Sequence, residues 1–392
     1  MEEWKTYRLG EVADVQTGPF GSQLHNEDYV PVGTPIVTVE HLGARRFSEQ
    51  NLPYVSKEDC KRLEKYTLRE GDIVFSRVGS VDRCSYVSSL EDGWLFSGRC
   101  LRVRPGELVH PLYLYYFFQK ESVKQEIRNV AVGATMPSIN TKLLSDLTVT
   151  LPSYTEQKRI ASALSSIDDK IELNNRINHN LERLLDSYFE DLLKQSCRSI
   201  PLSEVCETIK DGVHNTVIDC KDGPFYLLSC KNIKDGHITI GNDERRISNS
   251  TFEKLRRRTQ LSKWDILLSS VGTIGELVLL KEQPDCFEFQ RSVAIIKPAK
   301  RIGPFAVYSA LRRQKAEIIH AAHGAVQQCL FLSDINKFKI VVPSSEASIS
   351  AFNEHSLTIH CLIEEREKEN RALTSIRERI LPELLSGKID AF

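Results

Sequence analysis

Two long stretches of the chain repeat apolar residues at alternating steps of three and four, which is the spacing of a coiled-coil seam. The first runs from Thr155 to about Lys194 without a Gly or Pro, and the second runs from about Ala347 to Leu385. The predicted seam residues are Ile160, Leu164, Ile167, Ile171, Asn174, Asn178, Leu181, Leu185, Phe352, Ile359, Ile363, Asn370, Leu373 and Ile380. The pattern therefore predicts two long helices that pair with each other. The asparagines in the seam lower stability and fix the register.

The rest of the chain is an internal repeat. The apolar run that begins at Asp72 returns 193 residues later at Asp265, and Phe96 and Pro105 return as Phe289 and Pro298. Gly133 matches Gly324 at an offset of 191. We predict an α/β fold with two tandem domains separated by a long antiparallel two-helix coiled coil, with pseudo-twofold symmetry. The expected boundaries are 1–152 and 197–343 for the domains, and 153–196 and 344–392 for the long helices.

Bulk composition predicts a cytoplasmic protein. No run of eighteen apolar residues and no charged-then-apolar leader is found in the 392 residues. The ten cysteines form no Cys-x-x-Cys pair, so we expect buried, reduced thiols. The aromatic run from Tyr113 to Phe118 matches an apolar segment that begins at Phe305, and we interpret it as a core helix rather than an exposed stacking strip.

Net charge is −1, which by itself argues against a partner with high negative charge. Its distribution weakens that objection. Residues 1–150 carry 18 basic and 20 acidic side chains, whereas residues 201–345 carry 21 and 16. Positive charge is thus concentrated in the second domain, while the long helices carry the compensating acid.

Catalytic motifs are not found. The chain lacks a phosphate-binding Gly-x-x-x-x-Gly-Lys loop, a Gly-x-Ser-x-Gly elbow and a His-Glu-x-x-His pair. His320 and His323 have no third candidate ligand nearby, so we expect no metal site. Asp168, Asp169 and Lys170 are similar to a nuclease motif, but they lie within the heptad pattern, so we expect a solvated helix face.

The order of short sequence motifs in both halves resembles that in the specificity (S) subunits of Type I restriction-modification systems. The first half has Leu9, Gly10, Glu11 and Val12, then Gly18, Pro19, Phe20, Gly21 and Ser22, then Gly33, Thr34, Pro35, Ile36 and Val37. It continues with Gly71, Asp72, Ile73 and Val74, and with Pro152 before Glu156, Gln157, Lys158, Arg159, Ile160 and Ala161. The second half has Asp211, Gly212, Val213 and His214, then Asp265 with Gly272, Thr273, Ile274 and Gly275.

This resemblance implies a non-catalytic subunit with two target recognition domains. Each domain would read one half of a split, asymmetric sequence in double-stranded DNA. Two modification (methyltransferase) subunits would dock on the duplicated halves, and restriction/translocase subunits would join through the complex. The chain itself would bind no cofactor, while its partners would use S-adenosylmethionine, ATP and Mg. A helix of 40 residues spans roughly 60 Å, which limits the distance between domain centres to about 18 base pairs.

Candidate DNA contacts lie in Gly-rich turns and polar loops, because base edges are read by Arg, Asn, Gln and hydroxyl side chains. In the first domain they are Gln23, His25, Arg77, Ser80, Arg83 and Arg99. In the second they are His214, Asn215, Thr216, Ser270, Thr273, Gln290 and Arg291. For each of them a purely structural role at a turn or on the surface stays open.

Two other functional readings stay open as well. The duplicated domains could form a protein-protein scaffold that does not bind DNA, as the near-neutral charge suggests. The chain could also be an inactive allele of a specificity subunit.

Overall fold

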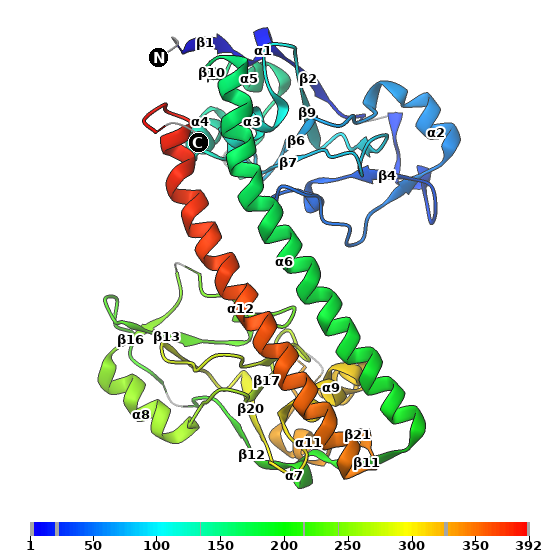
Figure 1. Ribbon diagram of the computed structural model, residues 1–392, viewed down its shortest axis with the longest axis vertical. Helices are drawn as coiled ribbons and strands as arrows, with labels where there is room; N and C mark the ends of the chain where they lie inside the picture. Colours follow the sequence, from blue (N-terminus) through cyan, green and yellow to red (C-terminus); the bar gives the residue numbers. More distant parts are fainter. Residues whose placement is uncertain are drawn as a thin grey trace. The chain divides into compact units, whose positions relative to one another are not determined.

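The computed structural model describes residues 4–19, 23–133, 135–214, 216–241, 243–324 and 328–389. The chain divides into two compact units (Figure 1). The first unit combines Met1–Glu172 with Arg371–Phe392, and the second is Leu173–Asn370. Each unit therefore holds one β-rich domain together with parts of both long helices.

The first unit contains a larger sheet of antiparallel strands and, beside it, a smaller sheet whose four strands are mostly shorter. The strands are β1 (Lys5–Arg8), β2 (Ala13–Thr17), β3 (Tyr29–Val30), β4 (Thr34–Val37), β5 (Tyr54–Val55), β6 (Ile73–Ser76), β7 (Cys84–Tyr86), β8 (Leu95–Phe96), β9 (Cys100–Pro105) and β10 (Thr148–Leu151). One sheet has the order β2-β9-β6-β7 and the other β3-β5-β4-β8, in which β4 and β8 are parallel. β1 pairs with β10, so the start of the domain lies beside its end.

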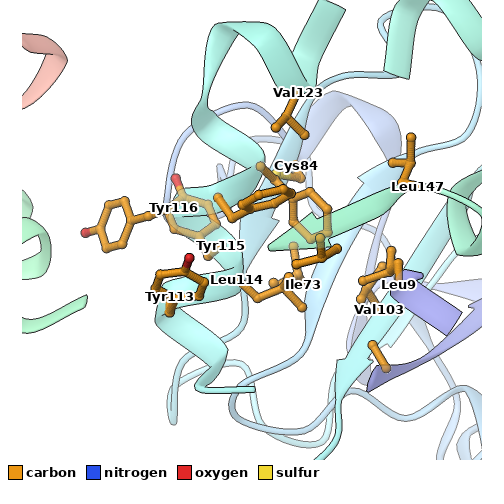
Figure 2. Packing of buried hydrophobic residues seen from close by; sticks show 14 of the residues in the cluster. Leu9, Ile73, Cys84, Val103, Tyr113, Leu114, Tyr115, Tyr116, Val123 and Leu147 are labelled. Carbon is orange, nitrogen blue, oxygen red and sulfur yellow. The ribbon is translucent and has the colours of Figure 1, made fainter. Parts of the chain in front are cut away.

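The short helices of this unit are α1 (Leu9–Val12), α2 (Lys57–Arg62), α3 (Pro111–Gln119), α4 (Glu121–Val130) and α5 (Thr141–Ser145). α1, α3 and α5 contact the larger sheet, whereas α2 lies beside the smaller one (Figure 1). Tyr113 to Phe118 are all buried in α3, which confirms the expected core helix. Figure 2 shows part of this core, with Leu114 of α3 beside Ile73 of β6. Burial of these apolar side chains is the main stabilising contribution to the domain.

The second unit repeats this plan. Its strands are β11 (Cys197–Pro201), β12 (Cys206–Asp211), β13 (Phe225–Leu228), β14 (Ile233–Lys234), β15 (His237–Ile238), β16 (Arg246–Ile247), β17 (Ile266–Ser269), β18 (Leu277–Leu279), β19 (Phe287–Phe289), β20 (Val293–Pro298) and β21 (Lys339–Pro343). Its short helices are α7 (Leu202–Val205), α8 (Asn249–Thr259), α9 (Pro304–Arg313), α10 (Lys315–His320) and α11 (Leu332–Lys337). The sheet β12-β20-β17-β18 corresponds to β2-β9-β6-β7, and β11 pairs with β21 as β1 pairs with β10.

The long helices are α6 (Tyr154–Gln195) and α12 (Glu346–Leu384), close to the predicted limits. Within the first unit, Ile160 and Leu164 of α6 share a core with Leu381 and Leu384 of α12. Within the second, Leu185 and Phe352 share another. The helices therefore run antiparallel in each unit, as predicted, and no predicted seam residue is exposed.

The polar layer of the seam lies in the second unit. Asn174 is buried, and its amide nitrogen donates to Asn370 Oδ1 at 2.9 Å and to Glu369 Oε2 at 2.7 Å. Asn370 in turn donates to Asn175 Oδ1 at 2.8 Å. These bonds join one level of α6 to one level of α12, so a shift in register would leave buried polar groups unpaired.

Two expectations about individual residues are wrong. Asp168 does not lie on a solvated face: it is buried, and it accepts from Tyr116 Oη at 2.7 Å and from Arg377 Nη1 at 2.8 Å. Of the ten cysteines, only Cys84 and Cys100 are buried, and none of the ten forms a disulfide bond. The seam pattern could not show that α3 would cover Asp168.

None of the helices in the described ranges has the length and apolar composition needed to cross a membrane. Over the same ranges, no group of three or more His, Cys, Asp or Glu side chains is arranged to hold a metal ion.

Candidate nucleic-acid interface

In the first unit four loops meet at one end of the larger sheet, and we call them loop cluster 1. They are residues 18–19 after β2, 77–83 between β6 and β7, 97–99 between β8 and β9, and the described part of 132–138. Main-chain hydrogen bonds join them: Arg77 N donates to Arg99 O at 2.8 Å, and Gly79 N donates to Pro137 O at 2.8 Å. The backbone therefore fixes these loops together.

Glycine permits this close approach. A Cβ on Gly18 would lie 2.2 Å from Ser97 O, which no side chain could occupy without moving the backbone. Gly79 has φ +74° and Gly133 has φ +113°, a region that residues with a side chain rarely adopt. The Gly-rich sequence words thus reflect chain packing at the loop cluster.

The second unit builds the same arrangement, loop cluster 2. It consists of the described parts of 212–216, 270–276, 290–292 and 322–329. Ser270 N donates to Ser292 O at 2.9 Å and Leu330 N donates to Ser270 O at 2.8 Å. Gly212 is the counterpart of Gly18, since a Cβ there would lie 2.3 Å from Gln290 O. The two units therefore carry equivalent loop clusters.

Four predicted residues of the first domain lie in loop cluster 1: Arg77, Ser80, Arg83 and Arg99. Ser80 and Arg99 are exposed. Arg77 is half-buried, and its guanidinium donates to Gly98 O at 3.2 Å and to Thr17 Oγ1 at 3.4 Å. Arg77 thus ties the end of β2 to the β8–β9 loop, while Ser80 and Arg99 present polar groups to solvent.

The fourth, Arg83, contacts a segment outside the loop cluster, and the remaining two candidates, Gln23 and His25, lie outside it altogether. Arg83 is exposed, but its guanidinium donates to Leu42 O and so contacts the segment after β4. Gln23 accepts from Tyr66 Oη at 2.7 Å through Oε1, which ties it to the 3-10 turn Glu64–Tyr66. His25 is exposed at the start of a 3-10 turn, with its backbone N donating to Asp28. No hydrogen bond found among the described residues joins Gln23 or His25 to loop cluster 1.

In loop cluster 2, His214, Thr216, Thr273 and Arg291 are exposed, and Gln290 is half-buried. His214 Nε2 lies 3.0 Å from Asp211 Oδ2. Burial raises the pKa of Asp211, and the neighbouring His214 partly offsets that shift. The Arg291 backbone N donates to Val213 O at 3.0 Å, so this residue stands where two loops meet.

Ser270 differs from these candidates, because it is buried and only 2% exposed. Asn215 lies outside the described residues, as do Phe20, Gly21 and Ser22 of the first Gly-rich word.

Sequence reasoning missed the fourth loop of each cluster. Val132 and Met136 are 63% and 65% exposed in the first unit, and His323 and Gln328 are exposed in the second. The available signal was the repeated glycine, Gly133 and Gly324, which have φ +113° and +132°. A glycine repeated in both halves with no regular element around it marks a loop that the fold needs in both.

The chemistry offered by both clusters suits binding. Exposed arginine, histidine and hydroxyl groups project from loops that the backbone holds in place. Arginine can pair with two acceptors on a guanine edge, and hydroxyl and backbone N–H groups can contact phosphates.

Comparison with known proteins identifies the family. The family model described as "Type I restriction modification DNA specificity domain" matches residues 1–183. The chain is 26% identical to the MjaX specificity subunit assigned to a type I restriction enzyme in Methanocaldococcus jannaschii, over 99% of this chain and 94% of that one. It is 23% identical to the HindI specificity subunit of Haemophilus influenzae, over 99% and 100%.

The crystal structure of a Type I restriction-modification S subunit from M. genitalium has a similar fold. Its TM-score is 0.59 at 17% identity, and the match covers 98% of this chain and 96% of that one. Specificity subunits of these systems recognise the DNA target and are non-catalytic. The family model matches residues 1–183, specificity subunits are similar over 99% of the chain, and the two-domain, two-helix fold is the same, so this protein belongs to the specificity subunits of Type I restriction-modification systems.

Proposed function

We propose that the chain reads a two-part, asymmetric DNA target, with one half bound at each loop cluster, and docks two modification subunits. The observation that carries this proposal is the duplicated loop cluster. Both units build it with the same backbone contacts, from Gly18 and Gly212 onward, but with different exposed side chains. Two loop clusters with the same backbone arrangement but different exposed side chains suit two different half-sites.

The arginines differ between the clusters in a way that supports unequal reading. In the first cluster Arg77 and Arg99 occupy the positions that Ser270 and Ser292 occupy in the second. In the second cluster the arginine is Arg291, one position earlier than the counterpart of Arg99. Since a bidentate arginine contact discriminates bases by about 1–3 kcal/mol, moving it by one residue would change the sequence that is read.

The duplication also accounts for two partners. Two similar halves offer two similar docking surfaces, so one chain would bind two copies of the same modification subunit. Those partners would supply S-adenosylmethionine-dependent adenine methylation, and the restriction subunits would add ATP- and Mg-dependent translocation and cleavage. This chain would contribute target recognition and the docking surfaces, but no catalysis.

The proposal is tested by mapping N6-methyladenine across the genome of cells that express this chain with the modification subunit from the same genome. We expect a new two-part motif that is absent without the chain. No new methylation despite a stable complex would favour a scaffold that does not bind DNA, or an inactive allele.

The same map tests the assignment of residues. Replacing Gln290 and Arg291 together by Ala should relax or weaken one half of the motif by about tenfold or more and leave the other half unaltered. The matched control is Lys300→Ala, an exposed cation beyond the other end of β20. An unchanged motif in the double variant would remove both residues from the contact set.

A further inference from the structure

Two glutamates occupy equivalent positions on the long helices and bind basic residues of their own domain. Glu172 of α6 and Glu364 of α12 are 192 residues apart, the offset that relates the two helices. In the first unit Glu172 accepts from Arg45 Nε at 2.8 Å and from Arg46 Nε at 3.2 Å. In the second unit Glu364 accepts from Lys263 Nζ at 2.8 Å.

Each contact has a neighbour one turn away or closer on the same helix. Asp169 of α6 also pairs with Arg45, whose side chain is only 8% exposed. Glu367 of α12 pairs with Lys281 at 2.6 Å, and the Lys281 side chain is 11% exposed. Burial lowers the pKa of Arg45, but its bonds to Glu172 and Asp169 outweigh that effect and raise it, so this arginine stays charged.

In the second unit the anchored elements carry the loop cluster. The β17–β18 hairpin holds loop 270–276, Lys263 lies just before β17, and Lys281 lies just after β18. The two ion pairs therefore hold both ends of this hairpin on α12. We call this hairpin, and the β6–β7 hairpin of the first unit, the recognition hairpins.

In the first unit the same connection passes through one more segment. The β6–β7 hairpin holds loop 77–83, and β7 is bound to residues 43–45: Tyr86 N donates to Arg45 O at 2.9 Å, and Ser85 Oγ donates to Ala44 O at 2.7 Å. Arg45 then pairs with α6. The repeat thus reaches the same result with different basic residues.

Such contacts control direction more than stability. Apolar packing is non-directional, so it tolerates a small rotation of a domain on its helix. Charge-assisted bonds at fixed points resist that rotation, and arginine adds the geometry of two parallel donors. A partly buried ion pair adds little net stability, so its contribution here is to orientation.

We propose that Asp169 and Glu172 in one unit, and Glu364 and Glu367 in the other, are positioning residues that fix each recognition hairpin on its long helix and thereby restrict the DNA target to a single spacer length. This inference rests on the proposed reading of a two-part target. The carboxylates would not touch DNA themselves, so they would affect the distance between half-sites but not the bases of either.

The test compares methylation maps of the intact complex. In the variants Asp169→Asn with Glu172→Gln, and Glu364→Gln with Glu367→Gln, we expect both half-sequences to be unaltered. Methylation at targets with one base pair added to or removed from the spacer should rise by about tenfold, the effect of losing one strongly coupled contact. The matched control is Glu365→Gln, an exposed carboxylate on the same helix, which should keep the single spacer.

A charge exchange separates positioning from general damage. Glu367→Lys alone should broaden the spacer, and Lys281→Glu added to it should restore the single value. A single unchanged spacer in both double variants, a folded variant that loses one half-sequence, or failure of the exchange to restore the spacer would each overturn the inference. Absence of any two-part motif with the unaltered chain would instead overturn the proposed function.

Discussion

At one repeat-equivalent position the two units bury different ionisable side chains. Asp168 in the first unit is held by Tyr116 and Arg377. Its counterpart 192 residues later is His360, which stacks on Phe305 with ring centroids 5.0 Å apart and lies near Trp264. The pKa of His360 is lowered to about 3, mainly by burial and to a smaller extent by the positive charges of nearby Lys281 and Arg312. The same repeat position thus holds a paired carboxylate in the first unit and a neutral imidazole ring in the second.

The pKa of His360 makes stability depend on pH. An unfolded histidine has a pKa of about 6.5, so between pH 6.5 and 3 the unfolded chain binds a proton that the folded chain does not. The stability contribution is present above pH 6.5 and is lost as pH falls towards 3. His360→Phe should remove this loss. The Tm of the variant minus the Tm of the unaltered chain should therefore increase as pH falls from 7 to 4.5.

Thermal unfolding followed by circular dichroism at several pH values measures this difference. His179→Gln, a change at an exposed histidine of α6, should keep the original pH response. If the His360→Phe variant and the unaltered chain lose Tm in parallel on acidification, the neutral buried imidazole is not the cause.

At the same scale, the sequence predicted the positions of loops better than which side chains face outward. Thr273 and Arg291 are exposed as expected, whereas Ser270 turns inward and Arg83 is held by a carbonyl group 41 residues earlier in the chain. Both outcomes depend on contacts between residues distant in sequence. A local pattern of glycines and polar residues does not contain that information.

Among the secondary-structure elements, the long helices could be predicted closely because their signal is local and periodic. The expected Thr155–Lys194 and Ala347–Leu385 lie within one residue of α6 and α12 at each end. The smaller sheets could not be predicted in the same way. β3, β5 and β8 are two residues long, and β4 pairs in parallel with β8 across some sixty residues of chain, so their formation depends on tertiary packing.

The asparagine layer between the helices should trade stability for register. Replacing both Asn174 and Asn370 by Leu removes a buried polar pair and adds apolar burial, so we expect Tm to rise. We also expect other registers to become populated. Disulfide crosslinking between single cysteines introduced on α6 and α12, in a background without the native cysteines, would measure the register.

Asn178→Leu, at a neighbouring seam position, provides the comparison: it should raise Tm without adding registers, because the bond between Asn174 and Asn370 is kept. A double variant that is less stable than the unaltered chain would contradict the assigned role of the layer.

For the whole molecule, the helices should set the spacer of the DNA target. Seven residues inserted after Asn178 in α6, and seven after Glu365 in α12, keep the heptad pattern on both sides of the antiparallel pair. The added rise is about 10 Å, so we expect the spacer to lengthen by about 3 base pairs with both half-sequences retained. Methylation mapping measures this change directly.

Insertion into α6 alone serves as the control, because it misaligns the seam and should lower Tm instead of giving a longer, well-defined spacer. A spacer that stays the same after the paired insertion would contradict the prediction that the length of the helices sets the length of the spacer.

The discontinuous first unit has a consequence for the order of events during synthesis. Residues 173–370 form the second unit from one continuous stretch, but the first unit needs Leu381, Leu384 and Leu385 to complete its core. Domains generally fold as they leave the ribosome. The domain translated first would therefore keep an apolar surface open while the other is made, and a ribosome that stops after residue 370 would release a chain with one finished domain and one that chaperones and proteases can recognise.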